Sequence, residues 1–313
     1  MKEYEELFIA KLAATLNILW GITDSNNILE IAKKYIEYKH SIDATLEDYL
    51  ERKLQLNLPY SWFKAIETHS IFYSYCYGLF KLVPLTFLAA GFPVAILMSD
   101  NIKTKQAEYF NKLSKLRLHQ NGWCTDFKLL SHKDENLLFK MRTLIEMGYK
   151  IIFFIDGNKG IEKSEKNLYK VSFKQSNFLF HQGFGIFNYL YKSDTLHGLS
   201  IANNNGNIVC RHWVDSVNSY LPKQEYTGTV IKITISNLDM LIHPDNVHQW
   251  DALLSLYKWK KHEKMFQKTN YPISKQFYTS FKIGKNEFYI LNHQTFMVYP
   301  TDEKTYHKLR IVL

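Results

Sequence analysis

Three short β-prone runs rich in apolar residues constrain the fold of this chain more than any other feature. They lie at residues 70–75, 93–98 and 149–155, with amphipathic helical stretches between them. A strand that is apolar on both sides is buried on both faces, and such strands alternating with helices are typical of a mostly parallel sheet. The sequence therefore predicts an α/β fold with a mostly parallel central sheet covered by helices.

Three segments are expected along the chain. Residues 1–68 place apolar residues at helical spacing and predict an N-terminal helical region. Residues 69–268 hold the α/β core. Residues 269–313 form a small β-rich appendage, because residues 277–291 read as a hairpin turning at residues 284–286.

Further elements are expected inside and around the core. Helices are predicted at residues 104–119, 135–147 and 246–261, and strands at residues 123–130, 196–202, 208–212 and 229–236, with a turn at residues 203–206.

The cysteines and the N-terminal residues indicate the cellular compartment of the protein. The three cysteines lie far apart with no paired spacing, which argues against a disulfide framework and against a zinc site. The first residues are acidic where a secretory signal is basic, and no uncharged run is long enough to span a bilayer. We expect a cytoplasmic protein with no transmembrane segment and no bound metal.

The chain carries a formal net charge of +9 with scattered lysines. A solvated surface accounts for such a pattern. The functional alternatives are an acidic protein partner, contact with an anionic lipid surface, or nucleic acid. No nucleic-acid motif supports the last of these.

Cys76 is the first candidate for chemistry. It follows the run at 70–75, Gly78 marks a turn, and a helix is expected to begin there. Amides at a helix N-terminus favour a thiolate, and Lys81 adds a positive charge, so Cys76 is a candidate nucleophile. The structural alternative is a small buried side chain, a common fate of free cysteine.

Asp156 is the second candidate. It ends the run at 149–155 and enters a turn with Gly157 and Asn158. The carboxylate is suited to orienting a base or binding an amine or hydroxyl, or it caps its own turn. Because ligands collect at the carboxyl ends of parallel strands, Cys76 and Asp156 are expected to share one site.

His181 is the histidine we select as a general base for Cys76, with a purely structural role as the alternative. His69 is nearer in sequence but precedes the strand. A strand of six residues spans about 20 Å, so His69 is expected at the opposite edge of the sheet.

The order of these motifs resembles the lipid A biosynthesis acyltransferase family, the lauroyl/myristoyl branch of the lysophospholipid acyltransferase superfamily. Residues 76–81, Cys-Tyr-Gly-Leu-Phe-Lys, fall where that family has His-Phe-Gly-Asn-Trp-Glu. The segments Gly91–Val94, Ile155–Gly157 and His243–Trp250 are similar to later motifs. The resemblance covers about residues 5–262 and implies an acyltransferase-like core.

The chain departs from the family where the reaction takes place. The family's histidine removes a proton from an acceptor hydroxyl, and the acid four residues on orients it. Here Cys76 and Lys81 replace both. The family mechanism is therefore not transferred.

Two functions remain open. In the first, Cys76 accepts an acyl group from a thioester donor, the phosphopantetheine of an acidic acyl or peptidyl carrier protein or coenzyme A. The enzyme then acylates a soluble amine or hydroxyl, in the biosynthesis of a specialised metabolite or peptide. His181 and Asp156 assist catalysis, while Lys81, Gly78, Gly157 and Asn158 bind substrate. In the second, the chain is a catalytically dead binding protein. Neither function needs a tightly bound cofactor.

Overall fold

The computed structural model describes residues 2–51, 53–98, 121–131, 134–156, 168–204, 206–259, 272–283 and 287–311. The helices are α1 (Lys2–Trp20), α2 (Ser25–Leu50), α3 (Tyr60–Thr68), α4 (Leu82–Ala89), α6 (Leu137–Glu146), α7 (Gly183–Leu190), α8 (Lys223–Leu241), α9 (Glu303–Leu309) and the 3-10 segments η3 (Val247–Gln249) and η4 (Leu253–Trp259). The strands are β1 (Ile71–Gly78), β2 (Val94–Met98), β3 (Phe127–Ser131), β4 (Lys150–Phe154), β5 (Leu168–Phe173), β6 (Ser176–His181), β7 (Thr195–Asn204), β8 (Asn207–Ser216), β9 (Tyr278–Ile283), β10 (Glu287–Asn292) and β11 (Val298–Pro300).

Contacts between residues divide the chain into two compact units. One comprises residues 1–39, 170–180 and 239–313, and the other comprises residues 40–169 and 181–238. These boundaries do not coincide with the three consecutive segments expected from the sequence. The difference arises because the C-terminal residues group with the N-terminal helix, a long-range relation that local patterns do not report.

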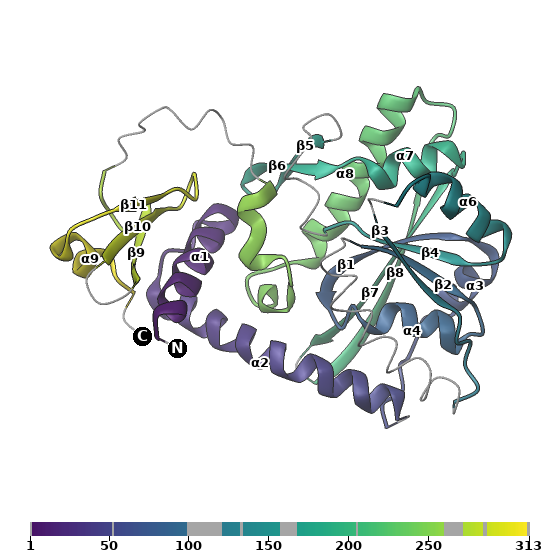
Figure 1. The fold of residues 1–313 in the computed structure, drawn as a ribbon, viewed down its shortest axis with the longest axis horizontal. Coiled ribbons are helices and arrows are strands. Elements are labelled where there is room, and N and C mark those ends of the chain that lie inside the picture. Colours follow the sequence, from purple (N-terminus) through teal and green to yellow (C-terminus); the bar gives the residue numbers. More distant parts are fainter. Residues whose placement is uncertain are drawn as a thin grey trace. The chain divides into compact units, whose positions relative to one another are not determined.

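The second unit is built on a six-stranded sheet with the order β3-β2-β4-β1-β7-β8 (Figure 1). The strands from β3 to β7 pair in parallel, and β8 joins β7 in the antiparallel direction. The expectation of a mostly parallel sheet is confirmed, and β1 lies in its interior between β4 and β7.

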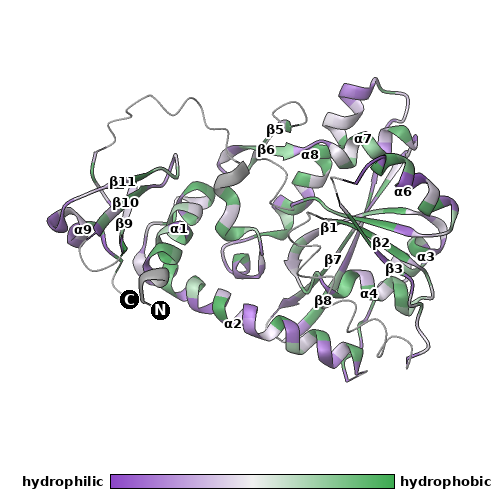
Figure 2. Ribbon diagram, viewed as in Figure 1, coloured by the Kyte–Doolittle hydropathy of each residue, from purple (hydrophilic) through white to green (hydrophobic). Residues whose placement is uncertain are grey.

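Strand β1 presents different side chains to the two faces of this sheet, as the alternation of a strand requires. On one face Phe72 packs edge-on against Phe87 of α4, with 4.9 Å between ring centroids. On the other face the hydroxyl of Tyr75 donates to the Thr234 carbonyl of α8 at 2.5 Å. Figure 2 shows that α4 is mostly hydrophobic, which fits a helix buried against the sheet.

Close packing beneath Tyr73 depends on a glycine in the neighbouring strand. Tyr73 is fully buried and is paired in register with Gly198 of β7. A β-carbon at residue 198 would lie 2.3 Å from the Tyr73 ring, closer than any tolerated contact. Gly198 is therefore needed for the ring to lie flat across β7.

A buried carboxylate links the two ends of the chain within the first unit. Glu6 of α1 accepts hydrogen bonds from the Tyr306 hydroxyl, the Arg310 guanidinium and the Lys282 backbone amide, each at 3.0 Å. Strands β9, β10 and β11 form the three-stranded sheet of this unit. The hairpin predicted at residues 277–291 is confirmed in β9 and β10, and its turn at 284–286 lies outside the described residues.

Most strands of the core were predicted correctly, but residues 229–236 were not. They belong to helix α8 rather than to a strand. Isoleucine alternates with polar residues from 231 to 236, as in a strand. In the structure, however, Ile231, Ile235 and Leu238 are all buried along one side of the helix. Packing against the sheet overrides the intrinsic preference of these residues.

The helix predicted at residues 246–261 is also corrected, over the residues described. It consists of the 3-10 segments η3 and η4. Val247, Trp250, Leu253 and Leu256 are completely buried at a spacing of three residues. That spacing places side chains in line along a 3-10 helix, whereas an α-helix would rotate them away from the core.

The remaining predicted elements divide into two groups. The strands predicted near residues 93–98, 123–130, 149–155, 196–202 and 208–212 and the helix at 135–147 are confirmed, with shifted ends. The helix predicted at 104–119 lies outside the described residues.

Within the described residues, no single helix combines the length and apolar character needed to cross a bilayer; residues 6–20 and 25–50 meet that test only jointly, across a sharp bend.

We predict that Gly198→Ala destabilises the protein by about 1–3 kcal/mol, because the added methyl group forces the buried Tyr73 ring to move. The change is measured as the free energy of unfolding in urea. Gly183→Ala is the matched control, since a β-carbon there meets nothing within 4 Å. Equal stabilities for the two variants would contradict the packing described for Tyr73.

Candidate functional site

The candidate site lies at the carboxyl ends of β1 and β4. From β1 the chain proceeds to β2 and β3 on one side, and it later enters β7 on the other side. This reversal is a topological switch point, where open α/β sheets bind ligands. Cys76 lies near the end of β1, and Asp156 follows the end of β4.

Asp156 and Cys76 are in direct contact. The Cys76 backbone amide donates to Oδ1 of Asp156 at 2.7 Å, and Asp156 is completely buried. The expectation that these two residues share one edge of the sheet is confirmed. The contact is a main-chain contact, so it fixes where the Cys76 backbone lies.

The break in the strand ladder explains why a side chain is needed here. The Ile155 amide donates to the Ser74 carbonyl at 3.0 Å and continues the β1–β4 pairing. Beyond Ser74 the register between β1 and β7 shifts. Asp156 supplies the acceptor for the next amide of β1, in place of a carbonyl of a neighbouring strand.

Gly78 allows β1 to end against β7. It adopts a φ of +59°, and a β-carbon would lie 2.3 Å from the Ile201 carbonyl oxygen. The following amide, of Leu79, donates to that same oxygen at 2.6 Å. These contacts account for glycine at residue 78, and substrate binding by Gly78 stays a prediction.

The local surroundings expected for Cys76 need correction. Cys76 lies inside β1, which continues to Gly78, and α4 begins only at Leu82. The residue is therefore not in the first turn of a helix. The apolar and aromatic residues flanking Cys76 extend the strand further than the turn signal of Gly78 indicated. The residue as a whole is partly exposed.

Lys81 makes an ion pair with a residue of helix α2. Its Nζ lies 2.6 Å from Oδ1 of Asp43, and the two side chains are 15% and 59% exposed, respectively. Part of the positive charge expected to stabilise the Cys76 thiolate is thus directed toward Asp43. Sequence reasoning missed Asp43, because nothing in the sequence links a solvent-facing position of a long helix to Lys81.

His181 ends β6, which pairs with β5 in a separate two-stranded sheet. The adjacent Gln182 side chain donates to the Leu168 carbonyl at 3.0 Å. The role of His181 as a base stays a prediction, and Gly157 and Asn158 lie outside the described residues. His69 precedes β1 and lies at the amino edge of the sheet, as expected.

A buried polar network that sequence reasoning missed connects helix α8 with strands β1 and β8. The Asn237 amide nitrogen donates to the Tyr73 hydroxyl and to the Asp215 carboxylate, both at 2.7 Å. Burial raises the pKa of Tyr75 well above its ordinary value, and Tyr73 and the Asp156 carboxylate raise it further. Tyr75 therefore stays neutral and serves as a hydrogen-bond donor.

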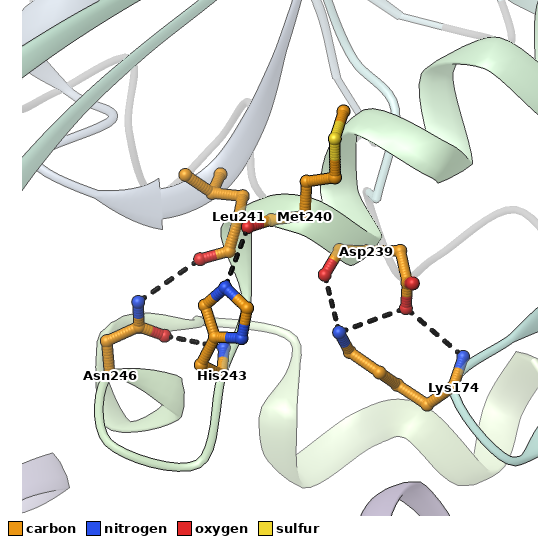
Figure 3. A network of polar contacts seen from close by, with 6 residues as sticks. All are labelled: Lys174, Asp239, Met240, Leu241, His243 and Asn246. Atoms are coloured by element: carbon orange, nitrogen blue, oxygen red, sulfur yellow. Dashed lines mark hydrogen bonds and ion pairs between the residues drawn. The ribbon is translucent and has the colours of Figure 1, made fainter.

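The segment His243–Trp250 begins with a cap for helix α8 (Figure 3). His243 Nε2 lies 2.9 Å from the Met240 carbonyl oxygen, and the Asn246 amide nitrogen donates to the Leu241 carbonyl at 3.1 Å. Asn246 also accepts from the His243 backbone amide at 2.8 Å.

Lys174 completes this cap from the turn between β5 and β6. Its Nζ donates to the Asp239 carbonyl at 2.5 Å and lies 3.0 Å from the Asp239 carboxylate. A cation at the C-terminal end of a helix is favoured by the helix dipole. The segment His243–Trp250 and Lys174 thus have a structural role, because together they provide partners for the last carbonyl groups of α8.

Across the described ranges, no group of three or more histidine, cysteine, aspartate or glutamate side chains is arranged to hold a metal ion. No protein-family model matches the chain, and no curated protein matches it either.

We predict that Asp156→Ala lowers the free energy of unfolding by about 1–3 kcal/mol, because the Cys76 amide loses its acceptor. Asp156→Asn keeps an acceptor oxygen and is expected to cost less. Urea denaturation of both variants measures the difference. Asp43→Asn removes a carboxylate that is 59% exposed, and it is the control with little expected effect. A loss in Asp156→Ala no larger than in this control would show that the contact contributes nothing.

Proposed function

We propose that the protein transfers an acyl group from a thioester donor through Cys76 to an amine or hydroxyl acceptor. One observation carries this proposal. A partly exposed cysteine lies at the carboxyl end of a central parallel strand, and the buried carboxylate of Asp156 holds its main chain in place. A nucleophile held rigidly at the ligand-binding edge of a sheet is suited to covalent catalysis.

The chemistry proceeds in two balanced steps. In the first, the Cys76 sulfur attacks the thioester carbonyl, the carbon–sulfur bond of the donor breaks, and the donor leaves as a thiol that has gained the Cys76 proton. In the second, the acceptor attacks the new thioester, the bond to Cys76 breaks, and the acceptor's proton returns to sulfur. Exchange between two thioesters is nearly thermoneutral, which suits cysteine to the first step.

Asp156 acts in this scheme as a positioning residue. Its carboxylate contacts the backbone amide of Cys76 rather than the reacting sulfur. His181 is the proposed base for the acceptor, and Gly157 and Asn158 are proposed to contact substrate. Lys81 is proposed to bind the donor's phosphate, in competition with its partner Asp43.

The net charge of +9 supports an acidic carrier protein as the donor, with its acyl group on phosphopantetheine; coenzyme A is the alternative. We further propose that the α/β core is a diverged relative of the lauroyl/myristoyl acyltransferases, on the motifs at residues 76–81, 91–94 and 155–157.

A binding protein without catalysis is the second candidate, and the ion pair of Lys81 with Asp43 favours it. A lysine already neutralised by a carboxylate stabilises a thiolate less effectively. In this second case the same edge of the sheet would hold an acyl chain, and Cys76 would form no bond to it.

The test is to incubate the protein with myristoyl-coenzyme A, or with a myristoylated acyl carrier protein, and to measure its intact mass. We expect one added acyl group on the wild-type protein and none on Cys76→Ala. Acyl transfer to Cys76 also predicts that added hydroxylamine, a strong amine acceptor, removes the group.

Two cysteine variants serve as controls. Burial raises the pKa of Cys210 to about 11, so that thiol stays protonated and Cys210→Ala is expected to acylate normally. Cys124→Ala removes a partly exposed thiol and is expected to acylate normally as well. An adduct that persists in Cys76→Ala would contradict the proposal. Tight binding of the donor without an adduct would support the binding protein.

A further inference from the structure

Three imidazoles cluster at the amino edge of the sheet, away from the candidate site. His69 precedes β1, His197 lies on β7 and His212 lies on β8. The rings of His69 and His197 lie 3.9 Å apart between centroids, and Nδ1 of His197 lies 3.1 Å from Nε2 of His212. His197 is only 5% exposed.

The contact between His197 and His212 limits how many protons the pair can hold. A hydrogen bond between two ring nitrogens needs one proton between them, so one of the facing nitrogens must be bare. The outer nitrogens, Nε2 of His197 and Nδ1 of His212, are buried and have no hydrogen-bond partner among the residues that the structure describes. A proton added at an outer nitrogen finds no acceptor within that described part of the chain. Full protonation of both rings also places two N–H groups against each other.

Charged neighbours act on the cluster from two further elements. Lys150, at the start of β4, is buried and donates to the His69 carbonyl at 2.8 Å. Burial lowers the pKa of His69; the Lys150 cation lowers it further, whereas Asp194, just before β7, raises it.

The pKa values of the two remaining imidazoles, His197 and His212, are lowered as well. Burial lowers the pKa of His197 to about 4, and His69 and His212 add to this effect. Burial and His69 lower the pKa of His212. All three rings are therefore neutral in the folded protein at pH 7.

The strand that carries His212 lies at an edge of the sheet. Among the described strands, β8 pairs with β7 alone and forms an edge of the sheet. Strand β7 also contacts the end of β1, where the Ile201 carbonyl accepts from Leu79. Loss of the pairing with β8 would therefore change the surroundings of β7, the strand that packs against the end of β1 at Gly78.

We propose that the cluster of His69, His197 and His212 is an acid-sensitive switch whose protonation releases strand β8 from β7. The direction of the pH effect follows from the linkage between protonation and stability. A histidine that is neutral when folded stabilises the fold fully above its unfolded pKa near 6.5, and this contribution is lost progressively as the pH falls toward the folded value. The proposal does not depend on acyl transfer.

His197 alone gives a lower bound for the pH dependence of the opening of β8. With a pKa of 6.5 in the open state and about 4 in the closed state, the opening equilibrium rises about 30-fold between pH 8 and pH 5. His212 and His69 add to this value in the same direction.

Hydrogen exchange measured by mass spectrometry on the whole protein tests the switch. After correction for intrinsic exchange rates, we expect the protection of β8 amides to fall about 30-fold or more from pH 8 to pH 5, with much smaller changes in β2. A ratio of β8 to β2 protection that does not change with pH would overturn the proposal, and this readout needs no variant.

His212→Gln removes one titrating group from the pair while keeping a polar side chain. We expect the pH dependence of β8 protection to shrink in this variant. His40→Gln, at an exposed position of α2, is the matched control and should retain the wild-type dependence. An unchanged pH dependence in His212→Gln would also overturn the proposal.

Discussion

The hydrogen bond from the Cys76 amide to Asp156 is the interaction on which the candidate site depends. It joins the end of β1 to the residues after β4 at the point where the pairing of β1 with β7 is interrupted. A completely buried carboxylate is costly unless it is hydrogen-bonded, and a strand amide without a partner is costly as well. Each group satisfies the other, so the Cys76 backbone has a defined position.

Glycine and tyrosine determine how closely the strands around this point approach each other. Gly198 leaves room for the Tyr73 ring, and Gly78 leaves room for the Ile201 carbonyl. The tyrosines of β1 also form polar contacts with α8 through Thr234 and Asn237. One face of β1 is thereby fixed to helix α8.

The sequence predicted the sheet because apolar runs at 93–98 and 149–155 are too short for helices, and the meeting of Cys76 with Asp156 followed from parallel strand direction. The sequence wrongly predicted a strand at 229–236. The many β-branched residues there favour a strand, whereas Ile231 and Ile235 are buried on one side of a helix. The sequence also failed to find Asp43, because an ion pair between distant elements leaves no local pattern. The catalytic roles rest on reactivity, which a sequence pattern can only suggest.

The most direct measurement of the central claim is alkylation of the folded protein by iodoacetamide, mapped to each cysteine by peptide mass spectrometry. If Cys76 lies at a ligand-binding edge, it is alkylated faster than Cys210, and a non-transferable thioether analogue of myristoyl-coenzyme A protects it. A Cys76 that resists alkylation in the folded protein, or reacts equally fast with and without the analogue, would contradict the account.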